Sequence, residues 1–464
     1  MTLKYATLAL VAAQCVAGLR FVMYMDQYHF KNLPGKDQTQ GISHAVMGFV
    51  PAGNLSMDTP PPVQLPVSLE TMRGHLSPDA KVSVAVGGWG PTAEFSEIAK
   101  DETSRDRFAK NVAAMLETTG FDGVDIDWEY PGGNGDDYKV HPNSEKVNEV
   151  ETFPLFIQAL RKVIGDEKLL SIATPGKRGD MIAYTAELGP KIWPHVDMVN
   201  VMSYDLMNRR DNVTKHHSSV IGSLDSIKAY KEIGAPPEKL NLGMAYYAKY
   251  FPVEANADCA DQPLGCPTVP MEGEQGEDLK NSGVRTFEPE YMIPIEVPAN
   301  LTVSTDQGCG IETGIKCPEG TCCSIWGSCG TTDEYCGENC LHHYGECTSP
   351  FDPTERFQRA MTNGKVDEEL GGAYWFDADY NIFWTWDTPE LMTRKFKDIV
   401  DAEGLGGVMA WSMGEDTYDF SHMKSMQDGV AARPEQRVEG ESGAAAATGN
   451  RNQNAPCMKA QAQK

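Results

Sequence analysis

Short runs of apolar and β-branched residues recur along the chain, and stretches with helical spacing lie between them. Apolar residues at three- and four-residue intervals predict helices over residues 104–119 and 152–164. Strands that alternate with helices are typical of βα units in a parallel sheet, and eight such units favour a closed barrel over an open sheet. The predicted fold is therefore an α/β (β/α)₈ TIM barrel with strands at 20–25, 43–49, 81–86, 123–129, 169–174, 198–204, 240–246 and 407–411.

The seventh and eighth predicted strands are much further apart than a plain loop between a strand and a helix requires. We expect an insertion over residues 251–371, with a compact cysteine-rich unit at 307–347 and partly folded flanks rich in Pro, Gly and acids. The interrupted barrel is expected over residues 19–427. Residues 428–464 are rich in Ala, Gly, Glu and Gln, which predicts a disordered tail.

Residues 1–18 have the pattern of a secretory signal peptide, with Lys4, an apolar run and then small residues. The alternative is a short first helix of the fold. The apolar run is too short to span a bilayer, so we expect a secreted extracellular protein, free or at the cell wall, with no membrane anchor. Three Asn-x-Ser/Thr sequons predict glycosylation at Asn54, Asn212 and Asn300.

Net charge indicates which partners are excluded, and cysteine content indicates the compartment. The 464 residues carry a formal net charge of −26, which repels phosphate backbones and argues against nucleic acid but not against an uncharged polymer. Of the twelve cysteines, eight lie between Cys309 and Cys347, and Cys259 and Cys266 are expected to form a further disulfide. This usage indicates an oxidising compartment.

Acidic residues alternate along the fourth predicted strand. Because alternate residues of a strand share a face, Asp125, Asp127 and Glu129 point one way, into the barrel, and Val124, Ile126 and Trp128 point toward the helices. Carboxylates so close together cannot all ionise easily, so some pKa values must rise, which supplies a proton donor near neutral pH. The alternatives for this acidic pattern are a solvent-exposed strand edge and a calcium or magnesium site.

The spacing of Asp122, Asp125, Asp127 and Glu129 resembles the signature of glycoside hydrolase family 18, the chitinases and their relatives. The resemblance extends to the Met-x-Tyr-Asp pattern at 202–205, to 243–249 in the seventh strand and to Trp411 at the end of the eighth. It implies a secreted chitinase that acts by substrate-assisted hydrolysis with retention, without metal or cofactor, on β-1,4-linked N-acetylglucosamine in chitin and chitooligosaccharides. The signal peptide, the sequons and the combination of domains suggest a eukaryotic source such as a fungus, and we expect a monomer.

The resemblance implies a role for each matching residue. Glu129 would protonate the glycosidic oxygen, Asp127 would hold the substrate acetamide, Asp125 would share a proton with Asp127, and Tyr204 would donate to the acetamide oxygen. The expected substrate-binding residues are Tyr24, Tyr130, Met202, Asp205 and Trp411.

Two positions depart from the family pattern. Ala85 stands where the family usually has Ser, so a hydroxyl that helps to hold the innermost carboxylates is absent. Lys249 replaces Arg, which exchanges a planar fork for a point charge. Neither position touches the expected proton donor.

The cysteine-rich unit is too small for a sufficient apolar core, so disulfides must supply its stability. Eight cysteines allow about 105 pairings. The stretch 322–336 resembles the hevein-like chitin-binding domain, which implies the pairs Cys309–Cys323, Cys317–Cys329, Cys322–Cys336 and Cys340–Cys347 and sugar binding by Ser324, Trp326 and Tyr335. The alternatives are a purely structural knot or a toxin-like inhibitor.

Two other functions remain open for the barrel: a chitin-binding lectin without activity, and an endo-β-N-acetylglucosaminidase that acts on glycoproteins. The presence of Glu129 favours an enzyme over a lectin, and the cysteine-rich unit favours an insoluble polymer over a glycoprotein. We further expect the long insertion to wall one side of a deep groove, which favours exo-type or processive cleavage.

Overall fold

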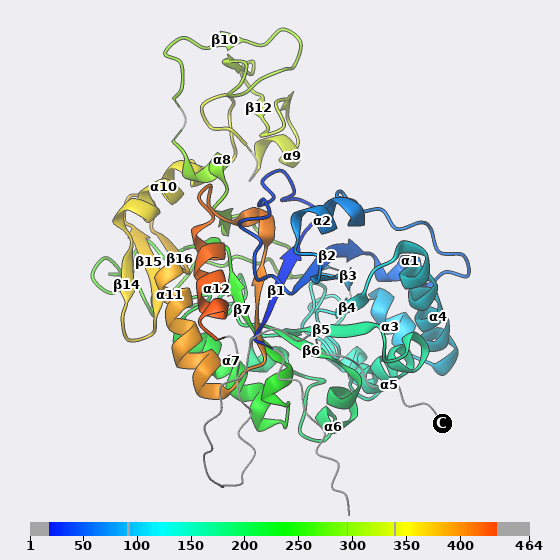
Figure 1. Cartoon of the computed structure of the whole chain (residues 1–464). Coiled ribbons are helices and arrows are strands. Elements are labelled where there is room, and N and C mark those ends of the chain that lie inside the picture. Colours follow the sequence, from blue (N-terminus) through cyan, green and yellow to red (C-terminus); the bar gives the residue numbers. More distant parts are fainter. Residues whose placement is uncertain (1–17, 91–92, 295, 338–339, 434–464) are drawn as a thin grey trace, which may run out of the picture.

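The central element of the molecule is a closed barrel of parallel strands (Figure 1). The computed structural model describes residues 18–90, 93–294, 296–337 and 340–433. The strands follow the cyclic order β1-β17-β7-β6-β5-β4-β3-β2, so the predicted TIM barrel is confirmed. Their bounds are β1 (Arg20–Met25), β2 (His44–Val50), β3 (Lys81–Gly87), β4 (Gly123–Asp127), β5 (Leu169–Pro175), β6 (Met198–Met202), β7 (Leu240–Ala245) and β17 (Gly407–Trp411).

Three barrel strands end earlier than predicted, and one of them, β7, ends at Ala245 and not at 246. Strand β4 ends at Asp127, which pairs with Gly87, the last residue of β3, and β6 ends at Met202. Beyond these points the chain leaves the barrel sheet and turns into the loops of the carboxyl rim. Glu129 and Tyr204 therefore lie on the rim and not within strands, which is where active sites of TIM barrels open.

Most of the helices cover the outside of the barrel, and the others belong to the insertion (Figure 1). Helix α4 starts after Asp101, whose carboxylate accepts from the Ser104 N–H at 2.8 Å, and stops at Gly120, where φ is 83°. Helix α5 begins earlier than the predicted residue 152. The helices are α1 (Ala52–Ser56), α2 (Leu69–His75), α3 (Ala93–Ala99), α4 (Glu102–Thr119), α5 (Val147–Ile164), α6 (Gly189–Ile192), α7 (Val220–Glu232), α8 (Pro289–Met292), α9 (Asp333–Cys336), α10 (Pro353–Asn363), α11 (Pro389–Lys395) and α12 (Ser421–Ala431).

The insertion between the last two barrel strands contains a five-stranded sheet, which the sequence did not predict. Its order is β14-β15-β16-β8-β9, and all its pairs are antiparallel. Strand β8 pairs with β16, which lies far along the chain, so neither segment has its partner nearby. The strands are β8 (Tyr247–Pro252), β9 (Gly283–Thr286), β14 (Lys365–Asp367), β15 (Gly372–Asp377) and β16 (Ile382–Trp386), so the insertion extends beyond 251–371 on both sides.

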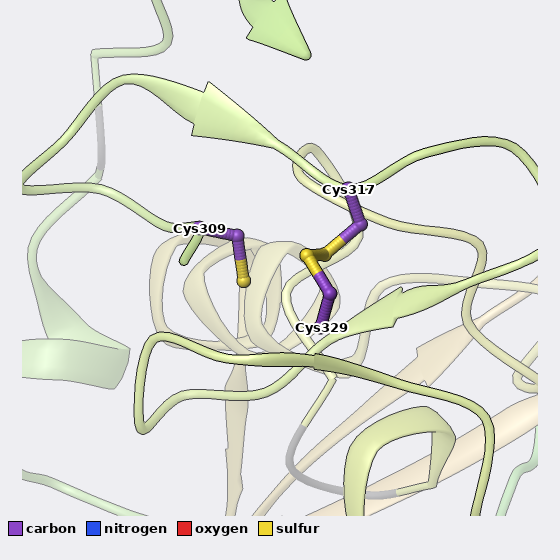
Figure 2. Close-up of side chains that lie close together, drawn as sticks. All are labelled: Cys309, Cys317 and Cys329. Carbon is purple, nitrogen blue, oxygen red and sulfur yellow. A yellow bond between two sulfur atoms is a disulfide. The ribbon is translucent and has the colours of Figure 1, made fainter. Parts of the chain in front are cut away.

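The cysteine-rich unit projects from the body of the molecule beside α8 (Figure 1). Its regular elements are short: β10 (Thr302–Val303), β11 (Ile315–Lys316), β12 (Cys322–Cys323), β13 (Cys329–Gly330) and α9. Figure 2 shows the Cys317–Cys329 disulfide with the sulfur of Cys309, which is bonded to Cys323, beside it. The remaining bonds join Cys322 to Cys336, Cys340 to Cys347 and, outside the unit, Cys259 to Cys266. The four pairs within the unit are those that the resemblance implies.

The ends of the chain need one correction. Helix α12 continues to Ala431, so the first residues of the predicted disordered tail are helical. They are held in place because Gly429 packs against the ring of Phe396, where an added Cβ would lie 2.3 Å from the ring. The predicted signal peptide, except Gly18, and the tail beyond residue 433 lie outside the described residues. In the described part of the chain, no helix is long and apolar enough to cross a membrane.

Candidate active site

The acidic strand β4 has the two faces that its sequence predicts. Asp125 is fully buried and Asp127 is 3% exposed, and both lie inside the barrel. On the opposite face, Trp128 stacks on Phe95 at 5.2 Å in the apolar layer beneath the helices, which also contains Val124 and Ile126. Glu129 follows at the rim, so one short segment places two carboxyl groups inside the barrel and a third at its mouth.

Asp125 is held by donors from three other strands. Its carboxylate accepts from the Tyr24 hydroxyl at 2.8 Å, the Ser171 hydroxyl at 2.5 Å and the Asn200 amide at 3.2 Å. Burial raises the pKa of Asp125, and these three hydrogen bonds oppose that rise. Tyr24 was expected to bind substrate, but it is 2% exposed and lies below the open cleft because its hydroxyl is committed to Asp125.

The missing hydroxyl at Ala85 is matched by one on the other side of β4. In the sheet register Asp125 lies between Ala85 of β3 and Ser171 of β5. Ser171 therefore supplies, from β5, a hydrogen bond that cannot come from Ala85. We missed Ser171 in the sequence because its strand shows an ordinary apolar pattern and only the register places it beside Asp125.

Asp127 and Glu129 have different electrostatic surroundings from Asp125. Burial, together with the charges of Glu129 and Asp125, raises the pKa of Asp127 well above its usual range. Its Oδ1 has no hydrogen-bond partner among the described residues. Removal from bulk water raises the pKa of Glu129 to about 7, and Asp205 and Asp180 add to this, whereas Tyr130 and Arg210 oppose it. Glu129 can therefore hold a proton near neutral pH.

These carboxyl groups open into a cleft of about 940 Å³ at the carboxyl ends of the strands. Trp411, which is partly exposed, stacks on Phe49 at 5.6 Å and presents a flat apolar surface to the cleft. The structure brings seven of the residues predicted from the sequence to its lining: Asp127, Glu129, Tyr130, Met202, Tyr204, Asp205 and Trp411.

Tyr204 and Asp205 lie across the cleft from β4. The nearest hydrogen-bonding partner of the Tyr204 hydroxyl is the sulfur of Met409 at 3.8 Å, which leaves the hydroxyl able to donate to a ligand. Asp205 Oδ1 accepts from the Tyr247 hydroxyl at 2.9 Å and from Lys249 Nζ at 3.0 Å. Burial raises the pKa of Asp205, but Lys249 and His217 outweigh this and lower it. The lysine at position 249 thus serves to keep Asp205 ionised.

Several lining residues were not predicted from the sequence. Trp89 is 48% exposed and directly follows Gly87 and Gly88, so its place after the third strand was the signal that could have identified it. Arg210 lies 5.3 Å from the Trp89 ring, in the same wall. The insertion contributes Phe251, Asp278, Ser282, Gly283 and Val284, which had no local signal because they reach the cleft only through the five-stranded sheet.

The cysteine-rich unit presents one large aromatic side chain to solvent. Trp326 is 62% exposed, and Tyr335 is partly exposed, with its ring packed 2.4 Å from where a Cβ on Gly330 would lie. Ser324 was expected to bind sugar, but it is only 1% exposed and its hydroxyl donates to the Ser328 carbonyl at 3.3 Å. The turn that exposes Trp326 places the Ser324 side chain in the interior of the unit, so in this conformation its hydroxyl cannot contact a sugar directly.

The fold and the site together define a TIM barrel with a carboxylate-lined cleft at the carboxyl ends of its strands. Residues 20–416 match the family model described as glycosyl hydrolases family 18, and the chain belongs to this family.

Curated and solved relatives agree on the family and the fold. Chitotriosidase-1 of Mus musculus is 31% identical over 233 residues, which is 46% of this chain and 47% of that protein. The chain thus spans about half the length of this curated relative. The chitinase RmChi1 of Rhizomucor miehei has a TM-score of 0.60 at 19% identity, with 88% of this chain and 99% of that chain covered. The Group IV chitinase of Ostrinia furnacalis in complex with allosamidin has a TM-score of 0.58 at 19% identity, with 89% and 99% covered.

Proposed function

We propose that this protein is a chitinase that hydrolyses β-1,4-N-acetylglucosamine linkages, with Glu129 as general acid and base. The observation that carries the proposal is the Asp127–Glu129 pair at the mouth of the barrel. Glu129 lines an open cleft with a pKa of about 7. Asp127 lies two residues before it, at the end of β4, and one of its carboxylate oxygens has no hydrogen-bond partner in the described part of the chain. A proton donor above a buried acceptor suits cleavage of a glycosidic bond next to an acetamide group.

The proposed reaction uses the substrate as its own nucleophile. Glu129 donates its proton to the glycosidic oxygen, the acetamide carbonyl oxygen attacks C1, and the bond to the leaving sugar breaks. Asp127 accepts the acetamide N–H and stabilises the positive charge of the oxazolinium ion. Water, deprotonated by Glu129, then attacks C1 from the face that the leaving sugar occupied, which retains the configuration and returns the proton to Glu129.

Neighbouring side chains orient this acetamide. Tyr204, whose hydroxyl makes a long contact of 3.8 Å with the sulfur of Met409, donates to the acetamide oxygen, and Asp205 binds adjacent sugar atoms. Trp411 forms an apolar floor for the pyranose ring. Asp125, held by Tyr24, Ser171 and Asn200, stays fixed beneath Asp127 and shares its proton.

The cysteine-rich unit is proposed to be a hevein-like module that holds the enzyme on insoluble chitin. The exposed ring of Trp326 has the flat apolar face that stacks on a pyranose ring. Tyr335 completes the binding surface, and Ser324 supports it from inside by its hydrogen bond to Ser328.

We further propose exo-type or processive cleavage, because the insertion encloses the cleft. The loop after β4 is tied to the insertion: Arg209 bridges Asp136 at 2.9 Å and Glu272 at 2.8 Å, and the Tyr138 hydroxyl donates to Glu272 at 2.8 Å. A groove closed on this side favours a chain end over the middle of a polymer. A fall in the viscosity of soluble chitin that far outpaces sugar release would contradict this proposal.

Secretion as a monomer is the remaining part of the proposal. Two of the three sequon asparagines, Asn212 and Asn300, are exposed, as glycosylation requires, whereas Asn54 is partly buried in α1. The disulfides fit an oxidising compartment outside the cell.

A panel of three substrates tests the function. The full chain is incubated with colloidal chitin, with chitotetraose and with a high-mannose glycoprotein, and the products are separated by chromatography. We expect small N-acetylglucosamine oligomers from the first two and no free glycan from the third. Free glycan alone would identify an endo-β-N-acetylglucosaminidase, and chitin binding without any product would identify a lectin.

A further inference from the structure

A second cluster of acidic groups surrounds a histidine at the edge of the cleft, apart from the β4 carboxylates. Asp26 follows β1, His29 lies in the same loop, and Glu415 follows β17. His29 Nδ1 lies 3.0 Å from both carboxylate oxygens of Asp26 and 3.2 Å from Glu415 Oε1. None of these three residues has a part in the proposed hydrolysis.

We propose that Asp26, His29 and Glu415 bind a divalent transition-metal ion such as Zn²⁺. One ligand atom from each residue lies within 4.8 Å of the other two. Two ligand atoms that each lie about 2.1 Å from one ion are about 3.0–3.4 Å apart when the angle between them at the ion is between a right angle and the tetrahedral value. His29 Nδ1 lies within this range of both other residues, at 3.0 Å from Asp26 and 3.2 Å from Glu415. One imidazole and two carboxylates form a donor set that suits Zn²⁺ better than Mg²⁺ or Ca²⁺.

The orientation of His29 provides independent support. Its other ring nitrogen, Nε2, faces Glu288 Oε2 at 3.6 Å, and Thr286 fixes Glu288 with a hydrogen bond of 2.6 Å. Metal-bound histidines commonly donate their second N–H to a carboxylate, which orients the ring. Glu288 would therefore hold His29 without touching the ion.

The other ligands are also preorganised. Asp26 Oδ1 accepts from the backbone N–H groups of Tyr28 and His29, and Ser412 donates to Oδ2. Glu415 is 4% exposed, and its Oε2 has no hydrogen-bond partner within the described ranges, so a buried oxygen in this cluster remains unsatisfied. An ion would satisfy it.

The backbone holds the two loops in contact at this point. A Cβ on Gly414 would lie 1.5 Å from the His29 carbonyl oxygen, so only glycine allows this approach. A bound ion would link the loops after the first and last barrel strands beside Trp411 and, through Glu288, the insertion. Its expected role is to fix the cleft wall, and it takes no part in the reaction.

Zn²⁺ binding to the full, untagged chain tests this site independently of chitin hydrolysis. Free thiols are alkylated, metals are removed with a chelator, and bound Zn²⁺ is counted after equilibrium dialysis, with Mg²⁺ in parallel. We expect about one Zn²⁺ per chain, a higher melting temperature with Zn²⁺, and a visible ligand-field spectrum when Co²⁺ is substituted. Absence of stoichiometric Zn²⁺ in the wild type would overturn the proposal whatever the variants do.

Variants then assign the ligands. His29→Ala and Glu415→Gln should each weaken Zn²⁺ binding at least tenfold and abolish the Co²⁺ spectrum. The matched controls are His141→Ala and Glu145→Gln, because these two residues form an exposed histidine–carboxylate pair at 3.6 Å on the surface. Binding that survives in His29→Ala, or that is lost equally in His141→Ala, would place the ion elsewhere and refute the site.

Discussion

The barrel cleft and the cysteine-rich unit are both proposed to meet chitin, but they are built in different ways. In the cleft, carboxyl groups are buried and held by residues from four strands, with Asp125 bonded to Tyr24, Ser171 and Asn200. In the cysteine-rich unit, four disulfides support an exposed Trp326. Burial changes the pKa of a group and so supports chemistry, whereas an exposed ring supports binding alone. The two functions should therefore be separable by mutation.

The largest effect is expected from Glu129→Gln. This change removes the proton donor but keeps the shape of the side chain, so kcat/KM on chitotetraose should fall by about 10²–10⁴-fold or more. Binding to insoluble chitin should stay unchanged, because Trp326 is untouched. A variant within tenfold of the wild type would show that Glu129 is not the donor.

Trp326→Ala should give the opposite result. Loss of the exposed ring should weaken binding to insoluble chitin about tenfold, which corresponds to about 1.4 kcal/mol. Turnover of chitotetraose should not change. The control is Ile325→Ala, which removes a neighbouring side chain that is 41% exposed but not aromatic. Equal loss in both variants would show that the aromatic face is not the binding element.

Ser171→Ala tests how Asp125 is held beneath the cleft. It removes the hydrogen bond to Asp125 that we expect to replace the absent hydroxyl at Ala85, and kcat/KM should fall about fivefold, as for the loss of about 1 kcal/mol. The double variant Ser171→Ala, Ala85→Ser places a hydroxyl on β3, at the residue that pairs with Asp125 on the side opposite to Ser171. Recovery of kcat/KM in the double variant supports a positioning role for Ser171, whereas no recovery contradicts it.

The smallest effect concerns pH. Glu129 must be protonated to act as acid, and its pKa is raised to about 7, so kcat/KM should be maintained below this pH and fall as pH rises through it. Asp180 contributes to this rise, so Asp180→Asn should move the alkaline limb of the profile to lower pH. A shift to higher pH would contradict the assignment. The profile of Trp326→Ala should match the wild type.

Local patterns account for what the sequence predicted. The barrel strands were found because each is a short apolar run, and the inward face of β4 was found because Asp125 and Asp127 alternate with Val124 and Ile126. The spacing of the cysteines resembles that of the hevein-like domain, and this resemblance implied the disulfide pairs.

Long-range pairing accounts for what the sequence did not predict. The sheet of the insertion joins β8 to β9 and, across the whole cysteine-rich unit, to β16, and no local pattern identifies such partners. Ser171 acquires its role only through the register with Asp125. His29 and Glu415, near opposite ends of the chain, meet only because the barrel closes between β1 and β17.

The central claim is that the substrate acetamide acts as nucleophile above Asp127, with Glu129 as acid. The most direct measurement is the anomeric form of the first products from chitotetraose, followed by proton NMR before mutarotation. The account predicts that the β-anomer appears first, because the configuration is retained. The α-anomer as the first product would show direct attack by water and would contradict the mechanism.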